Sequence, residues 1–292
     1  MGKFKKFLMA MGAVFTALIV ISAITAIFSN DEGGGFGDKV AVLEIEGVIT
    51  DSYAINKKLR EYARRDDVKA VVVRVNSPGG AVGASQEIYT EVKRLKEKKK
   101  VVISMGNVAA SGGYYIAAPA DMIVANPGTI TGSIGVIANF VNMEKLFGTI
   151  GLRTETIKSG EFKDTGSPSR PMTKEERALL QSVINDAHSQ FVDAVSEGRK
   201  IKKEEAALLA NGRVFTGAEA KRLGLVDKLG NLSDAITEAG KLAGISGEPR
   251  VLYPERKKGL FKELMEEGAR TLVNEASSSF SLMYMMPGIV KH

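Results

Sequence analysis

The segment from Ser104 to Tyr115 reads Ser-Met-Gly-Asn-Val-Ala-Ala-Ser-Gly-Gly-Tyr-Tyr, and it predicts a strand, a tight turn that carries a serine, and the start of a helix. An apolar run leads into the turn, and tiny residues flank Ser111 on both sides. A nucleophilic serine needs such a setting, because a sharp backbone must present its hydroxyl and free N–H groups must hold an oxyanion. For a lone Ala-Ser-Gly-Gly, a serine that caps a buried helix is the more common explanation. Motifs elsewhere in the chain decide between the two.

Apolar strands alternate with amphipathic segments along the chain. The sequence predicts strands at 40–49, 68–75, 101–104, 122–125, 134–137 and 152–157, and helices at 53–64, 83–98, 111–118, 173–197 and 234–243. The run from Val68 to Val75 is almost continuously apolar and β-branched, as in a strand buried on both faces. Thr173 and Glu176 have the spacing of a capping box. The alternation indicates an α/β fold with a mostly parallel sheet covered by helices.

The composition excludes several classes of site. The 292 residues include no cysteine and only two histidines, His188 and His292. Disulfides, thiolate nucleophiles and histidine-rich metal centres are therefore excluded, and we expect neither a metal nor a cofactor. The net charge is +6, and the lysine-rich run 93–100 is typical of an exposed helix end. No basic patch with interleaved aromatic residues suggests nucleic-acid binding.

The N-terminal region predicts a membrane anchor. Residues 7–28 form an uncharged apolar segment of 22 residues, which is long enough to span a hydrocarbon core of about 30 Å. The apolar region of a cleavable signal peptide is shorter, so we expect a retained transmembrane helix. Lys3, Lys5 and Lys6 precede it, which predicts a cytoplasmic N-terminus and a catalytic domain outside the cytoplasm, held at the cell membrane.

The expected domain organisation follows from these segments. Residues 1–6 form a cytoplasmic N-terminus, 7–28 the anchor, 29–38 a flexible glycine-rich linker, 39–250 the catalytic α/β domain, and 251–292 a C-terminal helix (260–276) and an apolar tail. An exposed apolar tail should seek a groove or a membrane. We therefore expect the run from Phe280 to Met286 to occupy the protein's own groove, where it could be clipped. A disordered tail or a contact with the membrane surface stays an open alternative.

Two further loops carry candidate functional residues. The first is Asn-Ser-Pro-Gly-Gly at 76–80, directly after a buried strand, where two glycines let the backbone approach a ligand. A plain turn is the alternative, and a phosphate loop is disfavoured because no Gly-Lys-Ser/Thr follows. The second loop, 159–168, carries Lys163 among glycine and serine residues. Since His188 falls in a predicted helix and His292 ends the chain, a lysine becomes a candidate base for a serine nucleophile.

Taken together, the motifs at 76–80, 106–115, 131–135, 159–168 and 213–230 resemble the signal peptide peptidase A family in its short, single-domain form. These are membrane-anchored serine peptidases with a Ser-Lys dyad, on the fold shared by the Clp protease and crotonase superfamily. The first two motifs would fit Clp protease equally well. The lysine loop and the predicted anchor select the signal peptide peptidase A family.

The resemblance implies a role for each matching residue. Ser111 falls on the family's nucleophile and Lys163 on its general base. Gly112, Gly80 and Gly79 fall on the oxyanion-hole segments, with Gly80 the better of the pair. Ser133 is a candidate for orienting the lysine amine. The resemblance also implies an endopeptidase that degrades remnant signal peptides through an acyl-enzyme, and a homo-oligomeric ring in which serine and lysine meet across neighbouring copies.

A lysine acts as a base only when it is neutral, and its ordinary pKa is about 10.4. Burial or a nearby positive charge must therefore lower the pKa of Lys163. Glu161 and Asp164 flank it and would raise that pKa if they pointed inward, so we expect them to face away.

Two other functions remain compatible with the sequence. A crotonase-type acyl-CoA enzyme would use the same fold and oxyanion glycines, although a location outside the cytoplasm argues against it. A non-catalytic, ring-forming membrane scaffold would leave Ser111 as a simple helix cap.

Overall fold

The computed structural model describes Thr16, residues 37–254 and residues 283–285. The predicted anchor at 7–28, apart from Thr16, and the predicted helix at 260–276 lie outside these residues. Within the described ranges, no helix combines the length and the hydropathy needed to cross a membrane.

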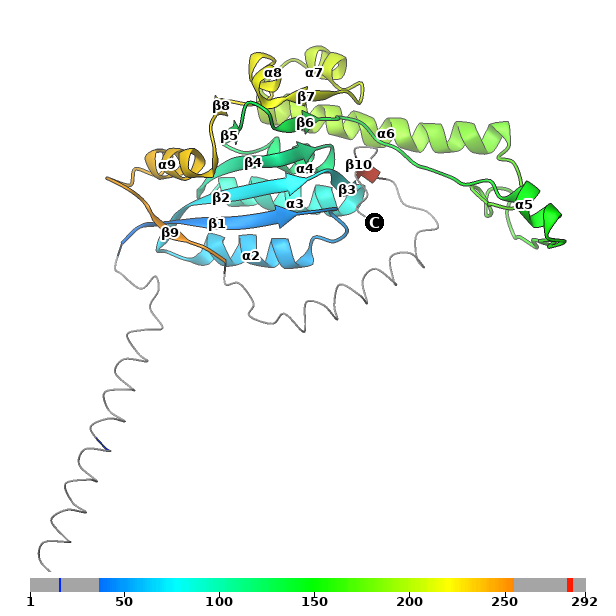
Figure 1. Cartoon of the computed structure of the whole chain (residues 1–292), viewed down its shortest axis with the longest axis horizontal. Helices are drawn as coiled ribbons and strands as arrows, with labels where there is room; N and C mark the ends of the chain where they lie inside the picture. The colour runs from blue at the N-terminus through cyan, green and yellow to red at the C-terminus, as the bar shows by residue number, and fades with distance from the viewer. Residues whose placement is uncertain (1–15, 17–36, 255–282, 286–292) are drawn as a thin grey trace, which may run out of the picture.

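One sheet organises the body of the molecule (Figure 1). Its main path runs β7-β6-β4-β2-β1-β9, with β5 beside β4 and β8 beside β5. The strands are β1 (Lys39–Glu46), β2 (Val68–Ser77), β4 (Lys100–Ala110), β5 (Met122–Ala125), β6 (Ile130–Gly132), β7 (Val214–Thr216), β8 (Lys228–Leu229) and β9 (Arg250–Leu252). Every pairing in this sheet is parallel except that of β6 with β7. The predicted α/β class with a mostly parallel sheet is confirmed.

Helices cover both faces of the sheet. They are α2 (Tyr53–Arg64), α3 (Val82–Lys96), α4 (Gly112–Ala117), α6 (Lys174–Arg199), α7 (Lys203–Leu209), α8 (Gly217–Arg222) and α9 (Leu232–Leu242). Alternate side chains of β1 enter two cores, as the period of a strand requires. Ala41 and Leu43 join the larger core with α2, α3, α4 and α6, whereas Val40 and Val42 join the smaller core with α9.

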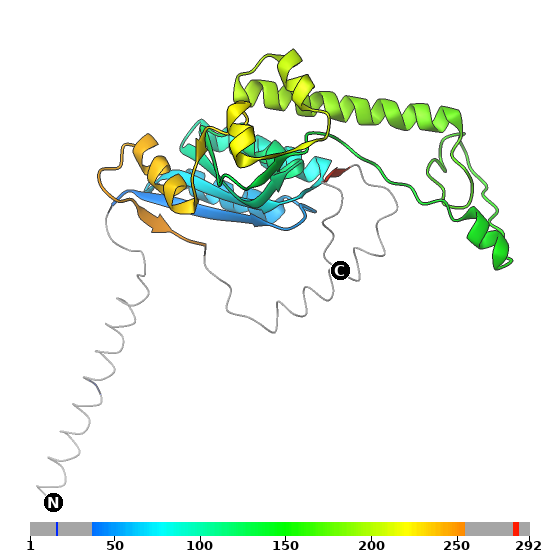
Figure 2. The same ribbon diagram turned by 45° about the horizontal axis from the view of Figure 1, so that its top comes forward.

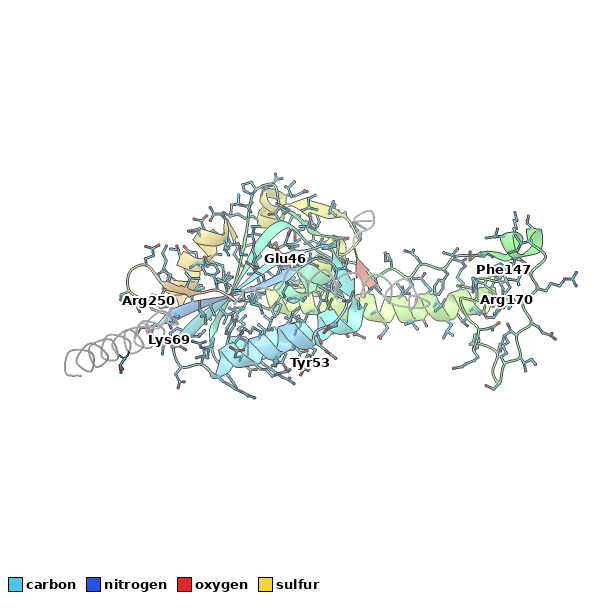
Figure 3. All side chains as sticks on the ribbon, turned by 60° about the horizontal axis from the view of Figure 1, so that its bottom comes forward. Glu46, Tyr53, Lys69, Phe147, Arg170 and Arg250 are labelled. Atoms are coloured by element: carbon cyan, nitrogen blue, oxygen red, sulfur yellow. The ribbon has the colours of Figure 1, made fainter. Side chains whose placement is uncertain are left out.

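Residues 138–173 form an arm that leaves the body, contains α5 (Glu144–Thr149) and returns to the start of α6 (Figures 1 and 2). Apart from Glu176, the buried residues of α6 begin only at Ala187, so the first half of this helix carries the arm away from the sheet. Phe147 and Arg170 mark the far end of the arm, opposite the end of the sheet marked by Lys69 and Arg250 (Figure 3).

Two strand predictions are wrong, one in this arm and one at its base. Residues 152–157 form no strand, because no neighbouring strand is present to pair with them, and Ile157 is 96% exposed. Residues 134–137 also form no regular strand. The strand at this place is β6, four residues earlier, because residues 130–132 are the ones that reach both β4 and β7.

Candidate active site

Ser111 stands at the junction of β4 and α4 in a strained backbone conformation. Its φ is 52° and its ψ is −118°, in a region that residues other than glycine rarely adopt. The Ser111 N–H donates to the carbonyl of Gly132 at 2.8 Å, and the Ser111 carbonyl accepts from the Tyr115 N–H at 2.8 Å. Such strain persists only where the surroundings enforce it, and it clusters at functional sites.

The hydroxyl of Ser111 has no hydrogen-bond partner among the described residues, although the residue is only 1% exposed. Ser111 occupies the N-cap position of α4, yet its side chain makes no capping hydrogen bond. A buried hydroxyl without a partner costs about 1–3 kcal/mol. The helix-cap explanation therefore does not account for this serine, whereas a reacting group that awaits a substrate does.

The glycine segments predicted for the oxyanion hole meet beside this turn. An added Cβ on Gly112 would lie 3.1 Å from the backbone nitrogen of Gly80 and 3.3 Å from Cα of Gly79. An added Cβ on Gly80 would lie 2.0 Å from the carbonyl oxygen of Ile49. Both positions therefore require glycine. The first N–H groups of α4 have no partner within the helix, so the N–H of Gly112 is available next to Ser111.

Ser85 is a site residue that sequence reasoning missed. It lies in the first turn of α3, is fully buried, and has no hydrogen-bond partner for its hydroxyl within the described chain. Its Oγ would be 2.6 Å from a Cβ on Gly112. The sequence held one signal for it: Ser85 shares the buried stripe of α3 with Ile88 and Val92, where an apolar residue is expected.

A short strand, β3 (Gly79–Ala81), carries the second glycine segment and pairs antiparallel with β10 (Met283–Met285) from the C-terminal tail (Figure 1). On its other side, the Gly79 carbonyl accepts from Ile49 at 2.9 Å and the Ala81 N–H donates to Ile49 at 2.7 Å. Because backbone groups alternate along a strand, those of Gly80 face β10, where Tyr284 is the opposing residue. An extended segment of this chain thus lies along the glycine strand.

Ser133 lies next to the Ser111 turn. It directly follows Gly132, whose carbonyl binds the N–H of Ser111, and it has a φ of 49° and is 5% exposed. A pocket opens beside it, and His188 of α6 also lines this pocket. His188 is held by a contact of 2.7 Å between its Nε2 and the carbonyl of Ala210, which is a packing role.

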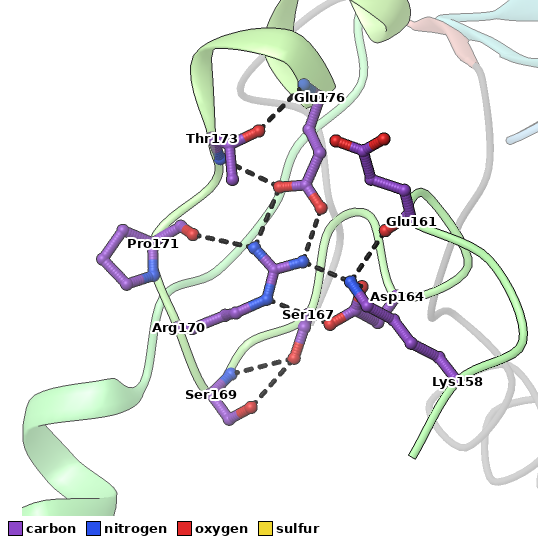
Figure 4. Close-up of polar contacts among 9 residues, drawn as sticks. All are labelled: Lys158, Glu161, Asp164, Ser167, Ser169, Arg170, Pro171, Thr173 and Glu176. Atoms are coloured by element: carbon purple, nitrogen blue, oxygen red, sulfur yellow. Dashed lines mark hydrogen bonds and ion pairs between the residues drawn. The ribbon is translucent and has the colours of Figure 1, made fainter. Parts of the chain in front are cut away.

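Lys163 lies on the arm and does not reach Ser111 within one chain. Its side chain is exposed and forms no ion pair or hydrogen bond with any residue that the structure describes. The loop that carries it is anchored at the N-terminus of α6 (Figure 4), a helix of 26 residues that is about 39 Å long. The carboxylate of Asp164 binds Lys158 and Arg170.

Comparison with known proteins assigns the family. Residues 93–246 match the family model of peptidase family S49, and residues 39–127 match the Clp protease model. The chain belongs to peptidase family S49, the signal peptide peptidase A family. The Clp protease match ends at residue 127, before the arm begins. Of the two family models, only that of S49 covers the arm of this S49 peptidase and Lys163.

Three relatives show how far the similarity extends. A Synechocystis protein named "Putative protease" is 46% identical over 71% of this chain and 75% of its own length. An Enterococcus faecium protein named "Putative signal peptide peptidase" is 36% identical over 72% of this chain and 65% of its own. Protease 4 of Haemophilus influenzae is 37% identical over 70% of this chain but only 35% of its own length. Each supports a peptidase on this fold.

Proposed function

We propose that this S49 peptidase is a membrane-anchored serine endopeptidase with a Ser-Lys dyad, and that it degrades remnant signal peptides and similar extended apolar peptides. The observation that carries the proposal is the buried hydroxyl of Ser111, which lies without a partner in a strained turn beside the N–H of Gly112. Membership of family S49 favours a peptidase over an acyl-CoA enzyme or a scaffold. The anchor and the location outside the cytoplasm rest on the sequence of residues 1–28.

The chemistry is acyl transfer in two steps. The neutral amine of Lys163 takes the proton of the Ser111 hydroxyl while Oγ attacks the scissile carbonyl carbon, and the N–H groups of Gly112 and Gly80 bind the oxyanion. The C–N bond then breaks, and the leaving amine takes the proton from the lysine ammonium. A water molecule, deprotonated by the same amine, attacks the acyl carbon; the ester bond to Ser111 Oγ breaks, and Oγ takes the proton from the lysine ammonium. Ser133 is placed beside Ser111 and would orient the amine.

The lysine comes from a neighbouring copy in this proposal. Lys163 lies on the arm beyond the N-terminus of α6, whereas the turn of Ser111 packs beside the later part of that helix, where Tyr115 contacts Phe191. In this proposal the dyad is therefore incomplete without a second copy. The arm also exposes large apolar side chains, which a partner would cover. They are Val141, Met143, Leu146, Ile150, Leu152, Ile157 and Phe162. The same contact would desolvate Lys163 and so lower its pKa toward neutrality.

The proposed substrate class fits the edge at β3. An extended peptide that adds to this edge gains main-chain hydrogen bonds irrespective of its sequence, and side-chain pockets then select among peptides. The pairing of β10 with β3 supports this mode of binding, because a segment of the chain itself lies there as an antiparallel strand. The apolar tail is accordingly proposed as a ligand of the groove.

A mixing experiment tests the dyad and its arrangement. Ser111→Ala and Lys163→Ala proteins, each expected to be inactive alone, are co-refolded and assayed on an apolar peptide. A mixed ring contains contacts in which an intact Ser111 meets an intact Lys163, so activity should return to roughly a quarter of wild type if copies associate at random. Lys145→Ala is the matched control, because Lys145 is another exposed lysine of the same arm and should be dispensable.

Each result has a defined meaning. Substantial activity in either single variant refutes the role of that residue. Two inactive variants that assemble but regain nothing on mixing would refute the arrangement between copies. A serine-directed fluorophosphonate probe that fails to label the assembled wild type at Ser111 would favour the scaffold.

A further inference from the structure

A four-residue ionic network surrounds the base of the lysine loop (Figure 4). The guanidinium of Arg170 grips Glu176 through two contacts, from Nη1 to Oε2 at 2.9 Å and from Nη2 to Oε1 at 2.5 Å. The same guanidinium binds Asp164 through Nε at 3.0 Å and Nη2 at 2.9 Å. Lys158 completes the network with a contact of 2.6 Å to Asp164 Oδ1.

This network ties the loop to the rigid end of α6. Glu176 has a side chain only 3% exposed, and its carboxylate also accepts from the Thr173 N–H at 2.9 Å within a capping box. Arg170 thus joins a fixed acid of the helix to Asp164, the residue directly after Lys163. A bidentate pair between arginine and a carboxylate fixes direction as well as distance.

The loop itself is a succession of tight turns with Lys163 at its centre. The Lys163 N–H donates to the Gly160 carbonyl at 3.2 Å, and the Ser167 N–H donates to the Asp164 carbonyl at 3.0 Å. Lys158 closes the loop from the other side, because its amine donates to the Glu161 carbonyl at 2.7 Å. Lys158 therefore holds a backbone carbonyl before Lys163, and Arg170 holds the side chain of the residue directly after it.

We propose that Arg170 is a positioning residue for Lys163: it fixes the place of the lysine loop on α6 and holds the carboxylate of Asp164 away from the lysine amine. The inference rests on the proposed role of Lys163 as general base. A base must lie within about 3 Å of the proton that it takes, and a displacement of about 1 Å costs about a hundredfold in rate. An arm that reaches into a neighbouring copy can meet this requirement only if its tip is rigid.

The charges of the network balance, which matters for a lysine that must lose its proton. Two cations, Lys158 and Arg170, offset two anions, Asp164 and Glu176. Nearby charged groups without an ion pair in the described ranges are Glu161 in the loop, Glu144, Lys145, Arg153 and Glu155 in the other half of the arm, and Lys174, Glu175 and Arg177 at the start of α6. Asp164 is the acid next in sequence to Lys163, so it is the one whose release would matter most.

The experiment measures kcat/KM against pH for the full-length, assembled enzyme. Arg170→Gln should lower the maximum of kcat/KM by about a hundredfold through kcat, because the loop loses its tie to α6. The acidic limb of the profile should also move up by about one pH unit, because Asp164 then keeps only Lys158 as a partner, and its less fully neutralised carboxylate favours the charged lysine. Arg170→Lys keeps the positive charge but loses the bidentate geometry of the guanidinium. Its kcat/KM and its acidic limb should therefore lie between those of the wild type and those of Arg170→Gln.

A double variant and a cap variant separate positioning from folding. Arg170→Gln/Asp164→Asn should return the acidic limb to the wild-type position while kcat stays low, because the released carboxylate is gone. Thr173→Ala removes the side-chain cap of α6 but leaves Asp164 bound, so it should leave the profile in place. Assembly is checked for each variant by light scattering.

The outcomes are distinguishable from a failure of the proposed function. If Lys163→Ala keeps activity, the role of the lysine is wrong and the inference falls with it. If Lys163→Ala is inactive while assembled Arg170→Gln shows the wild-type kcat and the wild-type profile, the proposed function stands and the positioning role is refuted. A lowered kcat with an unmoved acidic limb would refute the proposed effect of Arg170 on the Asp164 charge, but not its role in fixing the place of the loop.

Discussion

At the scale of single residues, the Ser111 turn leaves no room for one added methyl group at Gly112. The nearest atoms to such a methyl would be the hydroxyl of Ser85 at 2.6 Å and the backbone nitrogen of Gly80 at 3.1 Å. Gly112 and Gly80 both belong to the proposed oxyanion hole. A methyl group at Gly112 would therefore displace the N–H groups that are proposed to bind the oxyanion.

Gly112→Ala is therefore expected to lower kcat by about a hundred- to a thousandfold, the cost of losing one oxyanion donor, with little change in assembly. Gly83→Ala is the matched control, because a methyl there meets nothing within 4 Å and a helix gains stability from the exchange. Adding Ser85→Ala to Gly112→Ala removes the closest contact and should restore part of the activity. Wild-type kinetics for Gly112→Ala would refute the crowding argument.

The residues of this turn differ in how far the sequence could predict them. Ser111 and its glycines stand out because a nucleophile turn needs small residues next to one another in the chain. Ser85 approaches Gly112 from a different element, α3, and a contact of this kind depends on the packing of two helices. No local pattern encodes that packing, so only the serine's place in an apolar stripe could have signalled it.

At the scale of elements, the sequence predicted those parts whose local pattern agrees with their packing. Helix α2 and strand β5 have the predicted bounds, and the capping box of α6 is confirmed. Residues 152–157 have the composition of a strand but lie on the arm without a strand beside them. The sequence therefore predicted the buried core, whereas in the arm a strand-like composition meets no partner strand among the described residues.

The ion pairs that join the arm to the start of α6 should break in acid, when Glu176 and Asp164 become protonated. Hydrogen bonds from Arg170 and from the Thr173 backbone lower the pKa of Glu176 from its ordinary value of 4.5 to about 2. Arg170 and Lys158 also lower the pKa of Asp164. Because both folded-state values are depressed, the stabilisation is complete above about pH 4.5 and is lost as the pH falls toward 2.

Pepsin cleavage measures this loss, since the arm carries exposed apolar side chains. Between pH 4.5 and pH 2, cleavage within 140–170 should rise relative to cleavage within the sheet, which corrects for the pH dependence of pepsin itself. Asp164→Asn/Glu176→Gln should be cleaved readily at pH 4.5 and show little further rise. An equal pH response in wild type and double variant would contradict the assignment to these carboxylates.

At the scale of the whole molecule, the described chain holds the parts of the proposed site in two separate places. The serine, the glycines and the strand edge lie together on the body, while the proposed base lies at the far end of the arm. A single chain in this form should be a poor enzyme. Assembly would then raise the activity by completing the site. The C-terminal tail would lower the activity by occupying the edge of β3, where the substrate is proposed to bind.

The tail prediction can be tested at one backbone position. Since Gly80 and Tyr284 oppose each other with the backbone groups of Gly80 turned toward β10, a proline at 284 removes an N–H from this pairing. Tyr284→Pro should speed fluorophosphonate labelling of Ser111 in the assembled enzyme. Tyr284→Ala keeps the N–H and is the matched control, so it should change the rate less.

Intact mass then shows whether the tail is a substrate as well as an occupant. A tail that is clipped should be shorter in the wild type than in Ser111→Ala, and Tyr284→Pro should slow that shortening, because a strand that does not pair is not presented to the serine. Identical masses would remove self-cleavage and leave occupancy intact. Equal labelling rates for wild type, Tyr284→Ala and Tyr284→Pro would remove occupancy too, because the edge of β3 would then be open to substrate whatever the tail does.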